Sequence, residues 1–284
     1  MKAAKNWNED PAPLLRAGAG YELHGSDASA TPGFAGTKTA GEAALAANAT
    51  EVGNLQEKLF ANSLYDDSRS ILLVLQGMDS AGKGGIVKHV VGSVDPQGVM
   101  HASFKKPTPE ELKHDFLWRI RKHVPTPGQI GVFDRSHYED VLAGKVLNLA
   151  PADVIEERYR QINEFESELM AHGTTVVKVM LNISADEQKG RLAERLDRPD
   201  KYWKFNPDDI DSRELWNQYQ DAYQAVFDKT STTTAPWYVI PANRKWYARL
   251  AVQRLMMDAL RNLNQDWPAA TFDVEEQRAR LDLT

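Results

Sequence analysis

The sequence predicts an α/β fold with a parallel sheet of five strands and helices on both faces. Short apolar runs, several of them rich in β-branched residues, alternate with longer amphipathic segments, and a glycine-rich turn follows the first run. Strands that are apolar throughout are typical of a parallel sheet covered on both faces. We expect strands at residues 71–75, 99–104, 130–133, 174–183 and 237–240.

The helices are expected between these strands, and several carry clear start or stop signals. Thr108, Pro109 and Glu111 form a helix start, with an N-cap, a proline in the first position and a glutamate in the third. Gly173 ends one helix and Ser184 caps the next. We expect helices at residues 51–64, 86–94, 108–124, 153–172, 184–197, 212–229 and 245–263.

Residues 1–50 are expected to be an N-terminal extended arm. Residues 26–50 are rich in Ala, Gly, Thr and Ser and contain few large apolar side chains, so they bury little surface to offset the entropy of ordering. The arm could pack on the body or on a neighbouring subunit. We find no internal repeat and expect residues 51–284 to form one domain.

Composition excludes several classes of protein. The chain of 284 residues has a net charge of −6 and no cysteine. Disulfides, thiolate nucleophiles and Cys-ligated metals are therefore excluded, and a general nucleic-acid partner is disfavoured. No secretory signal and no apolar run long enough to span a membrane is apparent, so we expect a cytoplasmic protein without a membrane partner.

The glycine-rich turn has the features of a phosphate-binding P-loop. It lies between a strand and a helix, and Lys83 stands where the P-loop lysine is expected, which predicts a P-loop kinase fold. Backbone N–H groups and the helix N-terminus would bind phosphate oxygens. The alternative is a plain glycine turn with a solvated lysine. The expected phosphate-binding positions of the loop are Gly77, Ser80, Ala81, Gly82 and Gly84.

Two aspartates are candidates for a magnesium site. Gly84 replaces the Ser or Thr whose hydroxyl normally binds Mg²⁺ in a P-loop, so we expect Asp79 to help hold the ion. The alternative is that Asp79 only stabilises the turn. Asp134 ends an apolar strand, where P-loop folds complete the Mg²⁺ site. Arg135 follows and could bridge phosphate oxygens.

The residues after Arg135 are candidates for the nucleotide side of the site. We place Tyr138 and Glu139 there, because a carboxylate accepts hydrogen bonds from the amino and hydroxyl groups of a nucleotide. His137 could be catalytic, but we favour a structural histidine, since transfer of a phosphoryl group between anhydrides needs little acid–base catalysis.

Two basic clusters interrupt this acidic chain. Residues 189–204 contain six basic and three acidic side chains, a balance of +3, and Arg191, Arg195 and Arg198 fall on one helix face. We expect a helical lid at about 189–212 that excludes water from the phosphates. The alternative is a salt-bridged surface helix. Two separate clusters suggest a longer anion than one triphosphate, and the cations expected to bind it are Lys105, Lys106, Arg191, Arg198, Lys201 and Lys204, with Arg195 as a catalytic residue.

Taken together, these segments resemble the polyphosphate kinase 2 family. The matching segments are residues 75–84, 104–108 with 114–119, 133–142 and 195–204, within a likeness that covers about residues 30 to 265. The resemblance implies a thymidylate-kinase-like fold and Mg²⁺-dependent transfer, with Mn²⁺ as an open substitute. It assigns Asp79 and Asp134 to the metal, and Lys83, Arg135 and the lid arginines to the transferring phosphoryl group.

The resemblance also implies the partners. The expected substrates are inorganic polyphosphate and adenine nucleotides, with guanine nucleotides as an open alternative. The chain is also expected to form a homo-oligomer with copies of itself, either a dimer or a tetramer. Glu139 is similar to the residue found at this place in the branch of the family that accepts both AMP and ADP. Ala143, Gly144 and Lys145 depart from the family's pattern, which often has an arginine there. The competing interpretation is an ATP-dependent nucleoside-monophosphate kinase.

Overall fold

The computed structural model describes residues 7–284 and contains one sheet of six strands. The strand order is β1-β6-β5-β2-β4-β3. The bounds are β1 Arg16–Ala17, β2 Ser70–Gln76, β3 Val99–Ser103, β4 Ile130–Asp134, β5 Thr174–Asn182 and β6 Trp237–Pro241.

The five predicted strands all form, and they pair in parallel. The prediction of a purely parallel sheet of five strands is nevertheless wrong, because β1 adds to the edge of β6 in the antiparallel direction, with Arg16 opposite Tyr238. A strand of two residues is too short to show an alternating pattern. It forms because the arm reaches the open edge of β6.

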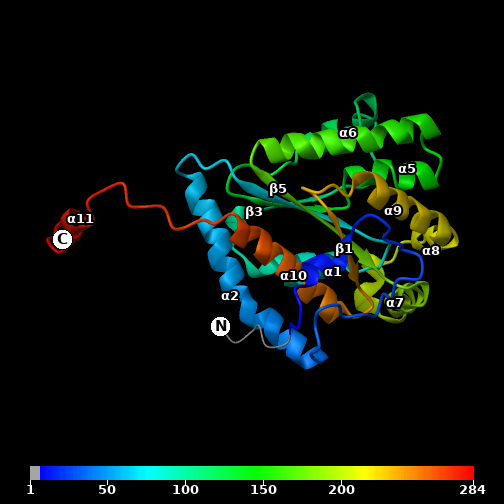
Figure 1. Cartoon of the computed structure of the whole chain (residues 1–284), viewed down its shortest axis with the longest axis horizontal. Helices are drawn as coiled ribbons and strands as arrows, with labels where there is room; N and C mark the ends of the chain where they lie inside the picture. The colour runs from blue at the N-terminus through cyan, green and yellow to red at the C-terminus, as the bar shows by residue number, and fades with distance from the viewer. Residues whose placement is uncertain (1–6) are drawn as a thin grey trace.

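Helices cover both faces of the sheet, as predicted (Figure 1). The principal helices are α2 Lys38–Ser63, α3 Lys83–His89, α6 Ala152–Ala171, α7 Ala185–Asp197, α8 Asp208–Glu214, α9 Trp216–Thr230 and α10 Lys245–Asn262. The shorter ones are α1 Pro11–Leu15, α4 Trp118–Arg121, α5 Ala143–Val146 and α11 Val274–Leu281. The 3-10 turns are η2 Val91–Ser93, η3 Pro96–Gly98, η4 Glu111–Lys113, η5 His137–Asp140 and η6 Pro199–Lys204.

Strand β2 lies at the centre and supplies side chains to two separate cores. Ile71, Leu73 and Leu75 pack with residues of α2, α3 and α10 on one face. Leu72 and Val74 pack with residues of α6 and α9 on the other. This alternation follows from the period of two along a strand. It fixes the end of β2, and hence the glycine-rich loop, between two rigid layers.

Helix α2 begins at Lys38, well before the expected start at residue 51. Its small side chains form a close-packing surface against α10. A Cβ atom on Gly41 would lie 2.4 Å from the ring of Trp246, and Asn48 donates to Gln253 at 3.2 Å. The composition that indicated an extended arm is therefore, from residue 38 onward, the composition of a tight helix–helix contact.

The expected helix at 108–124 is broken into η4 and α4. Its start is as predicted, because the backbone N–H of Thr108 donates to Glu111 at 2.7 Å and that of Glu111 to the Thr108 hydroxyl at 3.3 Å. Asp115 then accepts from the N–H of Leu117 at 3.0 Å, which starts a second turn in a new direction. The helix expected at 212–229 is likewise divided, into α8 and α9.

Residues 7–37 run along the edge of the body. The backbone N–H of Asn243 donates to Ala28 at 3.0 Å, and Tyr247 donates to the carbonyl of Pro32 at 2.7 Å. This part of the arm thus covers the carboxyl ends of β5 and β6. At the other terminus, α11 lies away from the sheet and its covering helices (Figure 1). Among the described helices, none is long and apolar enough to cross a membrane.

Candidate active site

The glycine-rich loop connects β2 to α3 and adopts a conformation that needs its glycines. Gly77 has φ of 145° and Gly82 has φ of 118°. A Cβ atom on Gly77 would lie 2.8 Å from the carbonyl oxygen of Leu181, so no larger residue fits. Because α3 starts at Lys83, the loop ends at a helix N-terminus, where backbone N–H groups lack helical partners.

Lys83 folds back over this loop. Its Nζ donates to the carbonyl of Gly77 at 2.6 Å and lies 3.5 Å from that of Met78. The ammonium group is thereby held beside the loop, and the interpretation of Lys83 as a solvated lysine is not what the structure shows. An ammonium group in this position can neutralise phosphate oxygens that bind the loop.

Three side chains from other elements hold the loop from outside. The Tyr223 hydroxyl on α9 accepts from the N–H of Gly77 at 3.0 Å, and Gln188 on α7 donates to the carbonyl of Asp79 at 3.0 Å. Burial raises the pKa of Tyr223 well above its usual value, so it remains a neutral phenol. Sequence reasoning missed both residues, because nothing in a helical pattern shows which polar side chain will meet a distant loop.

Arg191 is the third of these side chains, and its position differs from the expected one. It is 6% exposed. Its Nη1 donates to the carbonyls of Ser80 and Ala81 at 2.9 and 2.8 Å, and its Nη2 to those of Ala242 and Asn243 at 2.6 and 3.1 Å. Its Nε donates to Glu187 at 2.7 Å. Each N–H group of the guanidinium thus has a protein acceptor, and the geometry favours a loop anchor over the expected phosphate contact.

The two candidate metal ligands lie next to this loop. Asp134 pairs in register with Leu75, two residues before Gly77. Asp79 accepts from Nη2 of Arg135 at 2.7 Å. Arg135 has φ of 63°, an uncommon conformation for a residue with a side chain, immediately after β4. Burial alone would lower the pKa of Arg135, but the charges of Glu139 and Asp79 outweigh it and raise the pKa.

Glu139 lies behind Arg135 and beside the loop. Burial raises its pKa, and the charges of Arg135 and Lys83 oppose this rise. With the Gln76 amide oriented so that its nitrogen donates to Glu139 at 3.0 Å, the amide oxygen accepts from the Ser136 hydroxyl at 3.0 Å. Glu139 is thus a partly buried carboxylate, held in one orientation at the end of β4.

Tyr138 does not lie where the sequence placed it. It is fully buried, and its hydroxyl donates to Glu166 at 2.7 Å and accepts from Lys178 at 3.1 Å. The turn η5 directs Tyr138 into the core beneath the site, so we withdraw its assignment to the nucleotide. His137 is also fully buried and lies 3.3 Å from Glu166, in agreement with a structural histidine.

Arg195 on α7 pairs with Asp209 of α8. It donates to Asp209 at 3.0 Å and to the carbonyl of Lys204 at 2.9 Å. Burial raises the pKa of Asp209, and the charge of Asp79 adds to this effect. Sequence reasoning missed Asp209 as the acidic partner of Arg195.

The remaining predicted cations of the expected lid, Arg198, Lys201 and Lys204, contact neighbouring side chains of the same segment. Arg198 is exposed and donates to Asp200 at 2.7 Å. Lys201 pairs with Glu194, and Lys204 lies 4.8 Å from the centre of the Trp203 ring. Their pairing with neighbours matches a salt-bridged surface in this conformation, so the structure does not bring Arg198, Lys201 and Lys204 to the loop.

Lys105 and Lys106 follow β3 after one residue, Phe104, and are exposed. Ser103, the last residue of β3, pairs with Asp134, and the N–H of Phe104 donates to the Asp134 carbonyl at 3.2 Å. Arg119 donates to the carbonyl of Lys105 at 2.8 Å and fixes this segment. Two cations thus lie close to the strand end that carries Asp134, and their assignment to the path of a long anion stays a prediction.

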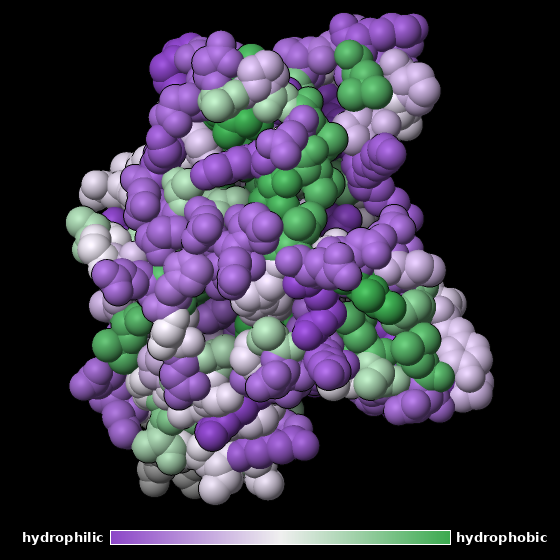
Figure 2. All heavy atoms as spheres, turned by 90° about the vertical axis from the view of Figure 1, so that its right-hand side faces the viewer, coloured by the Kyte–Doolittle hydropathy of each residue, from purple (hydrophilic) through white to green (hydrophobic). Residues whose placement is uncertain are grey.

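The site residues meet at the edge of the sheet that carries the carboxyl ends of the strands. Asp79, Lys83, Asp134 and Arg135 lie at adjoining strand ends. Figure 2 shows the side of the molecule on which α7, α8 and α9 lie, and hydrophilic residues cover most of it, with apolar residues between them.

Within residues 7–284, no group of three or more His, Asp and Glu side chains could hold a metal. Two carboxylates beside bound phosphates would suit Mg²⁺, which is usually held by one or two carboxylates and substrate oxygens.

Comparison with known proteins places this site in context. The family model described as Polyphosphate kinase 2 matches residues 36–268. An "AMP/ADP-polyphosphate phosphotransferase" of Meiothermus ruber is 46% identical over 87% of this chain and 91% of its own length. An "ADP-polyphosphate phosphotransferase" of Rhodopseudomonas palustris is 38% identical over 78% of this chain and 79% of its own. The crystal structure of a polyphosphate kinase 2 from Arthrobacter aurescens TC1 matches with a TM-score of 0.96 and 55% identity, over 98% of both chains.

Proposed function

Because the chain belongs to the polyphosphate kinase 2 family, we propose that it transfers phosphoryl groups reversibly between inorganic polyphosphate and nucleotides. The reactions are polyphosphate with ADP to give ATP, and polyphosphate with AMP to give ADP. The names of the relatives from Meiothermus ruber and Rhodopseudomonas palustris support this assignment. The observation that carries it is the convergence of Lys83, Arg135 and Asp134 on one glycine-rich loop.

The fold is that of a P-loop kinase, in the thymidylate-kinase-like arrangement. The strand β2, the loop of residues 77–82 and the helix α3 follow one another directly, and the parallel strands β3 to β6 lie around them. Residues 189–212 form the helical lid over the phosphates. In this arrangement the loop binds phosphate through its backbone at the helix N-terminus.

Asp79 and Asp134 would hold Mg²⁺ together with phosphate oxygens, and Mn²⁺ would be the substitute ion. The ion neutralises charge on the phosphates when bound. Asp79 uses one carboxylate oxygen for Arg135, which leaves the other for a ligand. Arg135 thus orients Asp79 and also presents its guanidinium to the phosphates.

The transfer needs no general base. An anionic phosphate oxygen of the nucleotide attacks the terminal phosphorus of polyphosphate, and the bond to the next bridging oxygen breaks, so one phosphoanhydride replaces another. The equilibrium is therefore near balance, and concentrations set the direction. Lys83 and Arg135 stabilise the transferring group by charge and position, and Arg195 joins them when the lid closes.

Polyphosphate enters along the segment that carries Lys105 and Lys106, and the nucleotide lies on the side of Glu139. The carboxylate of Glu139 accepts from the acceptor nucleotide, adenine or guanine, and supports the use of both AMP and ADP. We further propose a cytoplasmic homo-oligomer, a dimer or a tetramer, for which the family resemblance is the support.

One assay separates this function from that of an ATP-dependent nucleoside-monophosphate kinase. Purified enzyme is mixed with polyphosphate, Mg²⁺ and ADP, without ATP, and ATP formation is followed by luciferase. A parallel reaction uses AMP and follows ADP. We expect product in both, and none after chelation of the metal or when polyphosphate is left out, since a nucleoside-monophosphate kinase can form ATP from two ADP. Transfer to AMP from ATP but not from polyphosphate would assign the chain to the competing class.

A further inference from the structure

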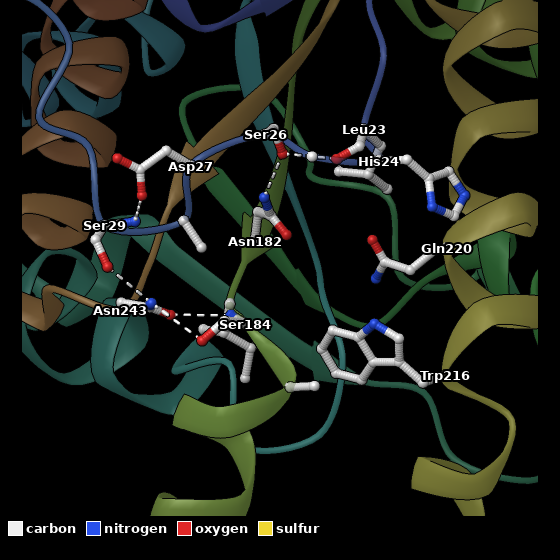
Figure 3. A pocket seen from close by; sticks show the side chains of 14 residues that line it. Leu23, His24, Ser26, Asp27, Ser29, Asn182, Ser184, Trp216, Gln220 and Asn243 are labelled. Carbon is white, nitrogen blue, oxygen red and sulfur yellow. Dashed lines mark hydrogen bonds between the residues drawn. The ribbon is translucent and has the colours of Figure 1, made fainter.

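A cavity of about 440 Å³ lies at the carboxyl ends of β5 and β6, beneath residues 23–29 of the arm (Figure 3). Its inner side is formed by residues 182–185 and Asn243, and its side wall by Trp216 and Gln220 of α9. Asp79, Lys83, Asp134 and Arg135 do not line it. The cavity is therefore separate from the transfer site, and its volume lies within the range of small-molecule sites.

Hydrogen bonds fix the arm segment that covers this cavity. Asn182 donates to the Ser26 hydroxyl at 2.8 Å, and Asn243 donates to the Ser29 hydroxyl at 2.9 Å, as Figure 3 shows. The N–H of Leu23 donates to Gln224 on α9 at 2.8 Å. Both ends of the covering segment are thus attached to the body, so the cavity is preformed.

Gln220 projects into this cavity with an unsatisfied polar group (Figure 3). The residue is 6% exposed, and its Nε2 is buried without a hydrogen-bond partner among residues 7–284. A buried donor without an acceptor is costly, and native structures contain few of them. An amide N–H pair kept in this position is suited to an acceptor that arrives with a ligand.

Trp216 lies one helical turn before Gln220 and therefore on the same side of α9. Its indole lines the cavity and forms no aromatic pair among the residues that the structure describes. The lining contains Asp27 and His24 but no lysine or arginine, and His24 is 2.8 Å from Asp221. A phosphorylated ligand would meet the Asp27 carboxylate here without a lysine or arginine, so the charge disfavours a nucleotide.

We propose that this cavity binds a planar, uncharged heterocycle of the nucleoside class. Trp216 contributes an aromatic surface for the ring, and Gln220 donates to a ring nitrogen or carbonyl. Tyr223, which holds the N–H of Gly77, lies one turn further along α9. The site is thus attached to the same helix as the phosphate loop, and the inference does not rest on the transfer activity.

Titration calorimetry on the full chain tests the proposal with four probes: adenosine, guanosine, cytidine and uridine. Saturating ADP is present, so that the transfer site is occupied. We expect saturable binding of at least one probe. Gln220→Leu should weaken that binding by roughly tenfold or more, since a site built around a hydrogen bond loses discrimination without it. Gln218→Leu, the same change at an exposed position of α9, should bind as the wild type does.

Thermal melting without a probe gives a second readout. Gln220→Leu removes an unpaired buried donor, so its Tm should equal or exceed that of the wild type. If that variant does not fold, Gln220→Met, with an unbranched side chain, takes its place. The proposal is overturned if none of the four nucleosides binds saturably, if excess ADP displaces the bound probe, or if the folded Gln220 variant binds it as tightly as the wild type.

Discussion

Replacing Arg191 by methionine distinguishes a loop anchor from a phosphate contact. Arg191 donates to four backbone carbonyls, two of the glycine-rich loop and two that follow β6, and pairs with Glu187. Methionine keeps much of the volume and removes every one of these bonds. The loop would then lose its link to the strand end at Ala242 and Asn243.

The expected loss of stability follows from these contacts. Four hydrogen bonds at about 0.5–1.5 kcal/mol each give about 2–6 kcal/mol. The pair with Glu187 adds little, because the Glu187 side chain is 35% exposed, so the central figure stays at about 4 kcal/mol. For a chain of this size, that corresponds to a fall in Tm of roughly 8–16 °C, at about 2–4 °C per kcal/mol.

The assay is thermal melting, with turnover measured well below the transition. Arg198→Met is the matched control, because Arg198 lies at the end of the same helix, is exposed and should change stability by no more than about 0.5 kcal/mol. We expect Arg191→Met to lose both stability and turnover. A variant that melts with the wild type yet loses turnover would refute the anchor and restore Arg191 to the phosphate path.

Three further predictions concern the transfer site and the core beneath it. Lys83→Ala or Asp134→Ala should lower kcat by roughly 10²–10³-fold or more in steady-state assays, as expected for lost preorganised charge, and near-normal turnover would remove either residue from the mechanism. Glu166→Gln leaves the Lys178 ammonium buried without an anionic partner and should cost about 3–5 kcal/mol in denaturant unfolding. Glu166→Leu with Lys178→Met should recover most of that loss, and an unstable double variant would contradict this view of the pair. Because burial raises the pKa of Glu139 above 4.5, turnover with AMP should fall as pH is lowered through that raised pKa, and Glu139→Gln should abolish this inflection; an unchanged profile would exclude Glu139 as its source.

Patterns carried by backbone and burial were predictable from the sequence. The strands were predicted because central parallel strands must be apolar on both faces, as residues 71–75 are and as residues 176–181 are apart from Lys178. The loop with Lys83 and the strand-end Asp134 were predicted because neighbouring parallel strands bring their carboxyl ends together. The short strand β1 could not be predicted, since its pairing depends on an edge that only the folded body supplies.

The errors in the site arise where direction and partner matter more than residue type. Arg191, Arg195 and Arg198 share a helical spacing, yet one is buried against the loop, one meets Asp209 and one is exposed. Tyr138 and Glu139 are neighbours, but a 3-10 turn sends the tyrosine into the core. Such differences depend on tertiary contacts, which a spacing argument does not contain.

The central claim is that Asp79 and Asp134 hold one divalent ion at the phosphorus beside Lys83. A crystal of the enzyme with Mn²⁺, ADP and a short polyphosphate tests it directly, because anomalous scattering locates the manganese. We predict a peak in contact with both carboxylates and with phosphate oxygens on the loop of residues 77–82. A manganese peak at the phosphates that touches neither aspartate would contradict it.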